Sequence, residues 1–199
     1  VGGRTHYPSE MVDLYLKRGQ HFFDTQKSTH SVHPLNYVLD HFYGDLTLSQ
    51  IRKHFLFVSY DLDRDEPFLF SDAQHHIQQI SVSKMMQACC ASPGFLDAVM
   101  IGNKRLADGL LTTKNPSKLA FHYARVFYPD DPIVMISIGT GDCGGNTYEE
   151  IQAEEQHRGL LEMARNDSKL VYFRFNPVLE HPDLEMEQLI DVTDVYIRN

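Results

Sequence analysis

An uninterrupted apolar run, Ile133–Ile138, leads directly into the glycine-rich turn Gly139-Thr140-Gly141. Such a run, bounded by charged residues and proline on one side and by glycine on the other, is typical of a strand buried on both faces. A long acidic segment with helical character follows at 146–165, and a second β-rich run at 170–175. Strands that alternate with helices predict an α/β layered fold with Ile133–Ile138 as a central, buried strand.

The earlier part of the chain predicts a hairpin and several helices. Residues 55–60 and 68–70 are apolar and β-rich, and the charged residues between them predict a turn. A short polar strand is expected at 102–107. Helical spacing and boundary residues predict helices after Ser9 and at 35–43, 48–55, 83–91 and 118–128. No repeat or linker composition divides the chain, so we expect a single domain over residues 1–199.

Composition and charge narrow the function classes. A chain of 199 residues with 42% hydrophobic and 23% charged residues can bury a core. Its net charge of -9 argues against a nucleic-acid partner. No apolar run approaches the roughly 20 residues of a membrane span, and no segment resembles a signal peptide. The three cysteines form no disulfide framework, which favours a cytoplasmic location, with or without peripheral membrane contact.

The segment 82–141 carries motifs in a specific order. An apolar helix ends in Ala91-Ser92-Pro93, a polar strand delivers Asp108-Gly109, Asn115-Pro116 opens a helix, and the apolar strand enters Gly139-Thr140-Gly141. This order resembles the patatin-like phospholipases. The segments 7–23 and 55–72 are also similar to that family, so the resemblance covers most of residues 7–145.

The resemblance implies a three-layer αβα sandwich around a mixed, mostly parallel sheet. It also implies a lipid acyl hydrolase that cleaves phospholipid or glycerolipid esters with a Ser-Asp dyad and without cofactor or metal. Asp108 stands at the position of the dyad aspartate and is the expected general base. Gly109, Asn115, Pro116, Gly139 and Gly141 support the match. The implied partner is a lipid, at a membrane surface or as a dispersed ester; a protein activator is left open.

The chain departs from the family pattern in one important respect. No G-x-S-x-G nucleophile elbow occurs in it. We therefore expect the serine, the first strand and the glycine-rich oxyanion loop to precede Val1, and this chain alone to be inactive. A fragment without these parts should expose a sheet edge and apolar surface, and should aggregate or be completed by another segment or chain. Leu110 also replaces the family's usual Gly or Ala.

Two other functions remain open at this stage. The first is an inactive patatin-like module that binds lipid or protein. The second is a cysteine hydrolase, because residues 141–145 match G-x-C-x-G around Cys143, although no partner His-Asp pair can be identified among histidines such as His157 and His181. The glycines at 139, 141 and 144 match a dinucleotide fingerprint, but no acidic residue ends the next strand, so a strand-to-helix turn is the simpler interpretation.

The candidate metal motifs are incomplete. Asp61, Asp63 and Asp65 have the spacing of a calcium loop, but Glu66 and Asp72 stand where that loop needs Gly and Glu. A solvated hairpin turn is therefore expected. The pairs His30/His33 and His75/His76 lack a third ligand in the sequence. No metal site is predicted.

Overall fold

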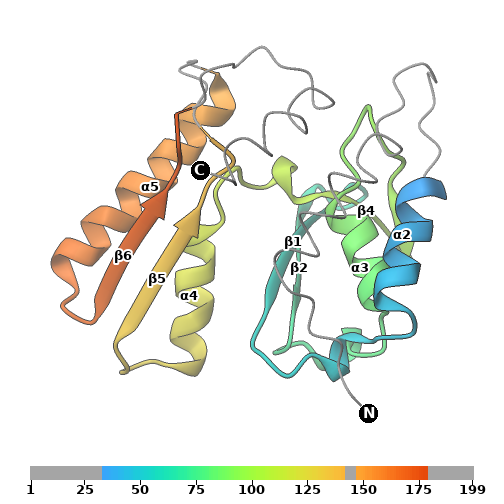
Figure 1. Ribbon diagram of the computed structural model, residues 1–199, viewed down its shortest axis with the longest axis horizontal. Helices are drawn as coiled ribbons and strands as arrows, with labels where there is room; N and C mark the ends of the chain where they lie inside the picture. Colours follow the sequence, from blue (N-terminus) through green and yellow to red (C-terminus); the bar gives the residue numbers. More distant parts are fainter. Residues whose placement is uncertain (1–32, 142–146, 179–199) are drawn as a thin grey trace, which may run out of the picture.

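The computed structural model of the protein describes residues 33–141 and 147–178. Two sheets lie beside each other, each carrying its own helices (Figure 1). One sheet has four strands in the order β2-β1-β4-β3, and the other pairs β5 with β6. The elements in chain order are α2 (His33–Tyr43), β1 (Leu56–Asp61), β2 (Glu66–Ser71), α3 (Val82–Cys89), β3 (Val99–Ile101), β4 (Lys104–Asp108), α4 (Ser117–Phe127), β5 (Ile133–Ile138), α5 (Tyr148–Asn166) and β6 (Leu170–Phe175).

Most predicted elements are confirmed, with boundaries that differ from the predicted ones by no more than two residues. The helix predicted at 48–55 is wrong: only a short 3-10 turn forms, at Leu48–Gln50. The chain is already extended before β1, where the Phe55 N–H donates to Asp72 Oδ1 at 3.0 Å. This bond across the hairpin fixes the start of β1 and competes with a helix there. The helix predicted after Ser9 lies outside the described residues.

The acidic turn between β1 and β2 is a hairpin turn, as predicted. Asp61 Oδ1 accepts hydrogen bonds from the backbone N–H groups of Asp63 and Arg64, and its Oδ2 receives the Lys104 ammonium at 3.0 Å. Burial alone raises the pKa of Asp61, but these hydrogen bonds outweigh it and hold the pKa below its usual range. The ionised Asp61 side chain therefore stabilises the turn.

The α/β class is confirmed, while the expectation of mostly parallel strands needs correction. Four of the six described strands form the antiparallel sheet, and only β5 and β6 pair in parallel. The reason is connection length: β1 and β2, and likewise β3 and β4, are joined by tight turns, which permit only antiparallel pairing. The connection from β5 to β6 contains the 19-residue α5 and permits a parallel pair.

Each sheet has its own core. Helix α3 packs on the antiparallel sheet, where Phe70, Met85 and Leu106 are fully buried. Helices α4 and α5 cover one face of β5–β6, where Phe121 and Leu160 pack against Leu170. None of the helices in the described ranges combines the length and apolar character that crossing a membrane requires.

The opposite face of β5–β6, called the outer face here, carries six large apolar side chains that are all exposed. They are Val134, Ile136, Ile138, Val171, Phe173 and Phe175. Within the described part of the chain, β5 pairs with β6 alone and has helices on one face only. Among these residues β5 is therefore not the central, buried strand that was predicted, and helices cover only one face of β5–β6. The expected exposed apolar surface is present.

We expect the 199-residue chain to self-associate through the outer face, because a contiguous apolar patch of this kind favours association in water. Ile136 and Phe173 are cross-strand partners with 62% and 51% exposure. Changing both to lysine should restore a monomer in sedimentation velocity. Because both side chains are exposed, but two lysines at paired positions repel each other, the double variant should lower the free energy of unfolding by no more than about 2 kcal/mol.

Val126→Lys provides the matched control, since Val126 is equally exposed but lies on α4, away from the outer face. It should leave self-association unchanged. A monodisperse wild-type monomer would contradict the expectation. A large loss of stability in the Ile136/Phe173 double variant would instead mean that the chain itself covers this face.

Candidate active site

Asp108 ends strand β4 and is fixed by backbone hydrogen bonds. Its N–H donates to Ala91 O at 2.9 Å, and its carboxylate Oδ1 accepts from the Leu110 N–H at 2.9 Å. Across the sheet, Asp108 pairs with Ser59 of β1. The predicted base is therefore held at a strand end, between the segment that follows α3 and a short 3-10 turn.

Gly109 lets two backbone segments approach closely beside Asp108. A Cβ added to Gly109 would lie 2.3 Å from the carbonyl oxygen of Val58 in β1. No side chain can be accommodated at that distance, because the obstacle is backbone of the central part of the sheet. The glycine that follows Asp108 is thus required by packing.

The surroundings of Asp108 favour its neutral form more than water does. Burial raises the pKa of Asp108, and the Leu110 N–H and the charge of Lys114 only partly oppose this effect. A carboxylate with a raised pKa is a stronger base in its ionised form. The nearby Cys89 is not a competing nucleophile, because burial, followed by the charges of Cys90 and Asp108, raises its pKa to about 12.

A cavity of about 1200 Å³ lies at the carboxyl ends of β5 and β6, and the segments that follow α3 and β4 complete its wall. The structure brings four of the supporting motif residues together in its wall: Asn115, Pro116, Gly139 and Gly141. Asp108 and Gly109 themselves do not line this cavity, but Leu110 does. Asp108, the candidate base, therefore lies just outside the cavity, two residues before Leu110 in its wall.

Ser59 is the serine directly opposite Asp108, but it is not available as a nucleophile. Its side chain is fully buried, and its hydroxyl donates to Ala107 O at 2.6 Å. Cys143 and Gly144, which belong to the alternative motifs, lie outside the described residues, as does His181. His157 Nδ1 bonds the Tyr172 hydroxyl at 2.9 Å. Among residues 33–141 and 147–178, no three potential ligands gather to hold a metal ion.

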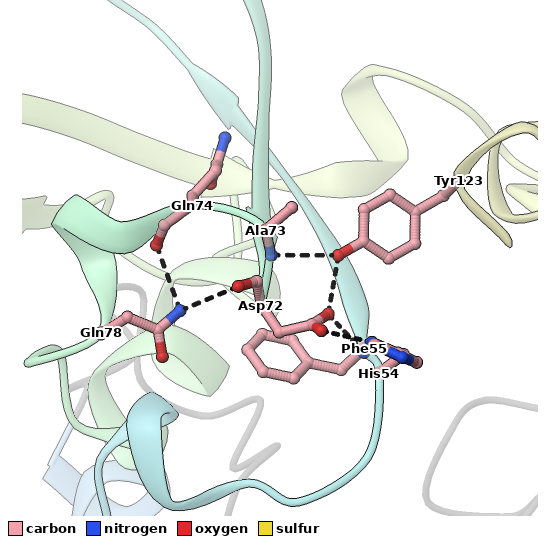
Figure 2. Close-up of polar contacts among 7 residues, drawn as sticks. All are labelled: His54, Phe55, Asp72, Ala73, Gln74, Gln78 and Tyr123. Atoms are coloured by element: carbon pink, nitrogen blue, oxygen red, sulfur yellow. Dashed lines mark hydrogen bonds and ion pairs between the residues drawn. The ribbon is translucent and has the colours of Figure 1, made fainter. Parts of the chain in front are cut away.

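A second polar cluster, which the sequence did not reveal, joins the hairpin to α4. Figure 2 shows Asp72 at its centre, bonded to His54 Nδ1 through Oδ2 and to the Tyr123 hydroxyl at 2.7 Å through Oδ1. Burial alone raises the pKa of Asp72, but hydrogen bonds from Tyr123 and His54 hold it below its usual range. His54 also stacks on Phe127, with ring centroids 3.9 Å apart.

The His54–Asp72 pair connects the antiparallel sheet to α4, through the contacts with Tyr123 and Phe127. Tyr123 accepts the Ala73 N–H and donates to Asp72, so its hydroxyl proton is engaged in this cluster. None of His54, Asp72 and Tyr123 lines the cavity. Only the fold brings the three together, since 51 positions separate Asp72 from Tyr123, which is why no local motif could reveal them.

Three comparisons place the chain among known proteins. It is 34% identical over 131 residues to calcium-independent phospholipase A2-gamma of Oryctolagus cuniculus, covering 55% of this chain and 16% of that protein. The Homo sapiens protein of the same name is 31% identical over 119 residues, covering 51% and 15%. Phospholipase A I of Arabidopsis thaliana is 29% identical over 126 residues, covering 54% and 9%. The chain thus spans less than a fifth of the length of these relatives. No family model matches it.

Proposed function

The chain is a homologue of the patatin-like phospholipases, and from this premise we propose that it forms part of a lipid acyl hydrolase. The observation that carries the proposal is the position of Asp108, held at a strand end beside a large cavity. Asn115, Pro116, Gly139 and Gly141 line that cavity. Residues of this chain would thus supply the base and much of the substrate cavity.

In this proposal a serine outside the chain attacks the acyl carbonyl of a phospholipid or glycerolipid. Asp108 accepts the serine proton and returns it to the leaving alcohol, and water then hydrolyses the acyl-enzyme. Two backbone N–H groups of a glycine-rich loop, also outside the chain, would stabilise the oxyanion. The raised pKa of Asp108 suits the base role.

The apolar part of the cavity wall supports an acyl substrate. Phe95, Leu110 and Leu111 line it and are not fully buried, so their apolar surface is available to a hydrocarbon chain. We propose one domain over residues 1–199 and a cytoplasmic protein that meets its lipid at a membrane surface or as a dispersed ester.

The test is release of fatty acid from phosphatidylcholine micelles by the longest natural protein that contains this chain. We expect release, together with labelling of a serine outside residues 1–199 by a fluorophosphonate probe. Cys143→Ala should leave the rate unchanged. Loss of activity in that variant without serine labelling would favour the cysteine hydrolase. Lipid binding without fatty acid release would favour an inactive binding module.

A further inference from the structure

Arg174 of β6 lies at the wall of the cavity and has no acidic partner among residues 33–141 and 147–178. Its side chain is half-buried, on the face of β5–β6 that α4 and α5 cover. Among the described residues no carboxylate forms an ion pair with it. Its one hydrogen bond to these residues runs from Nη1 to Ser137 Oγ, at 2.7 Å. A guanidinium has five N–H donors, so most remain available.

A chain of buried side chains fixes the orientation of Arg174. Ser117 Oγ donates to Asn115 Oδ1 at 2.6 Å, so it accepts from Ser137 Oγ, which lies 2.7 Å away. Ser137 in turn accepts from Arg174, and the Asn115 amide donates to Ala153 O at 3.1 Å. Each hydroxyl gives one proton and receives one. Asn115, Ser117 and Ser137 are all at most 7% exposed, so the guanidinium is held before any ligand arrives.

Gly139 leaves the space in which the guanidinium lies. A Cβ on Gly139 would be 2.8 Å from Arg174 Nη2 and 2.0 Å from Asn176 Oδ1. Asn176 Oδ1 accepts the Gly141 N–H at 3.1 Å and fixes the turn after β5. Arg174 thus lies over this turn, at the carboxyl ends of two parallel strands, the position where ligands commonly bind in α/β sheets.

The other charges of the cavity wall are three carboxylates and two cations. Glu149 pairs with Lys114 at 2.7 Å, and Glu150 caps α5 by accepting from Thr147. Glu154 and Arg158 both belong to α5 and are exposed. These pairings leave Arg174 as the half-buried charge that no side chain of the wall neutralises. A buried charge is costly unless it is paired, so the site favours an anion.

We propose that Arg174 binds the phosphate group of a ligand that occupies this cavity. A guanidinium recognises phosphate through two parallel N–H···O bonds, and its fixed orientation suits this geometry. The phosphate comes from a phospholipid head group or from a soluble phosphate ester. Only the lipid source rests on the function proposed above; the phosphate site itself does not.

The experiment measures binding without turnover. Isothermal titration calorimetry tests whether a soluble phosphate ester binds. The ligand is sn-glycerol 3-phosphate, and glycerol, which lacks the phosphate, is the neutral control. Flotation with vesicles of phosphatidylglycerol in phosphatidylcholine tests the lipid source. We expect at least one ligand to bind the wild type and Arg174→Gln to weaken it about 10- to 100-fold. Arg174→Lys should keep the charge, lose the two-pronged contact and fall between the two.

Arg165→Gln is the matched control, because Arg165 is exposed at the end of α5 and does not line the cavity. It should bind like the wild type. Circular dichroism shows whether Arg174→Gln is folded; if it is not, Arg174→Lys decides. Equal binding by wild type and both Arg174 variants would overturn the site. So would the absence of binding of both ligands by the folded wild type.

Discussion

Asp108→Asn should lower the rate of ester hydrolysis by the whole protein about 100- to 10,000-fold, the range expected for loss of a general base. Asparagine has the shape of aspartate and can still accept the Leu110 N–H that Asp108 Oδ1 now accepts. It cannot accept the serine proton. The fold should therefore persist, which circular dichroism and thermal melting would check, while fatty acid release is lost.

The pH profile gives a second readout of the same base. In the proposed mechanism Asp108 acts only when ionised, and burial raises its pKa. The wild-type rate should therefore fall as the pH drops through that raised pKa, at a higher pH than for an ordinary carboxylate. Asp97→Asn, at an exposed aspartate nearby in the chain, is the control and should change neither rate nor profile. Near-normal turnover in Asp108→Asn would remove Asp108 from the mechanism.

Gly109→Ala should destabilise the protein by about 3 kcal/mol, the upper part of the range for overpacking in a well-packed interior. The new methyl group would lie 2.3 Å from Val58 O and 2.8 Å from Val58 C. Neither atom can move freely, because Val58 pairs with Leu69 inside the sheet. In thermal unfolding the midpoint should fall by about 6–12 °C, given 2–4 °C per kcal/mol for a chain of this size.

Gly159→Ala makes the same chemical change and should have the opposite sign. Gly159 lies in the interior of α5, and a Cβ there meets no atom within 4 Å. Alanine is better than glycine in a helix by about 1 kcal/mol, so the midpoint should rise. If both variants shifted the midpoint equally, close approach to Val58 would not be the cause of the loss at Gly109.

Local sequence patterns predicted the helices and strands well, because the formation of a helix or strand depends mainly on neighbouring residues. The apolar runs that became β5 and β6 have the predicted limits, and the hairpin β1–β2 follows from apolar segments around an acidic turn. The burial of β5 could not be predicted in the same way. An all-apolar strand is typical of two covered faces, but what covers a face depends on other segments; here Ile136 is 62% exposed.

The candidate site shows the same contrast between local and non-local information. The order of the surrounding motifs in the sequence predicts Asp108 as the base, and this stays a prediction; in the structure, the neighbouring Leu110 lines a cavity. Arg174 was not identifiable, since its support comes from Ser137, 37 positions earlier, and from Ser117, another 20 positions before that. No periodicity or spacing in the sequence relates Ser117, Ser137 and Arg174, because they meet only when α4, β5 and β6 have packed together.

The two sheets also differ in the order in which they can assemble. In the hairpin, Asp61 pairs with Glu66 across a turn of a few residues, and such hairpins form in about 1–10 μs. Ile133 pairs with Leu170 only after the whole of α5 has been spanned. Non-local parallel pairing is slow because the chain entropy of the long connection is lost before the contacts form. The hairpin sheet should therefore act as the early nucleus, and the strand ends that carry Gly139 and Arg174 should be among the last parts of the molecule to be organised.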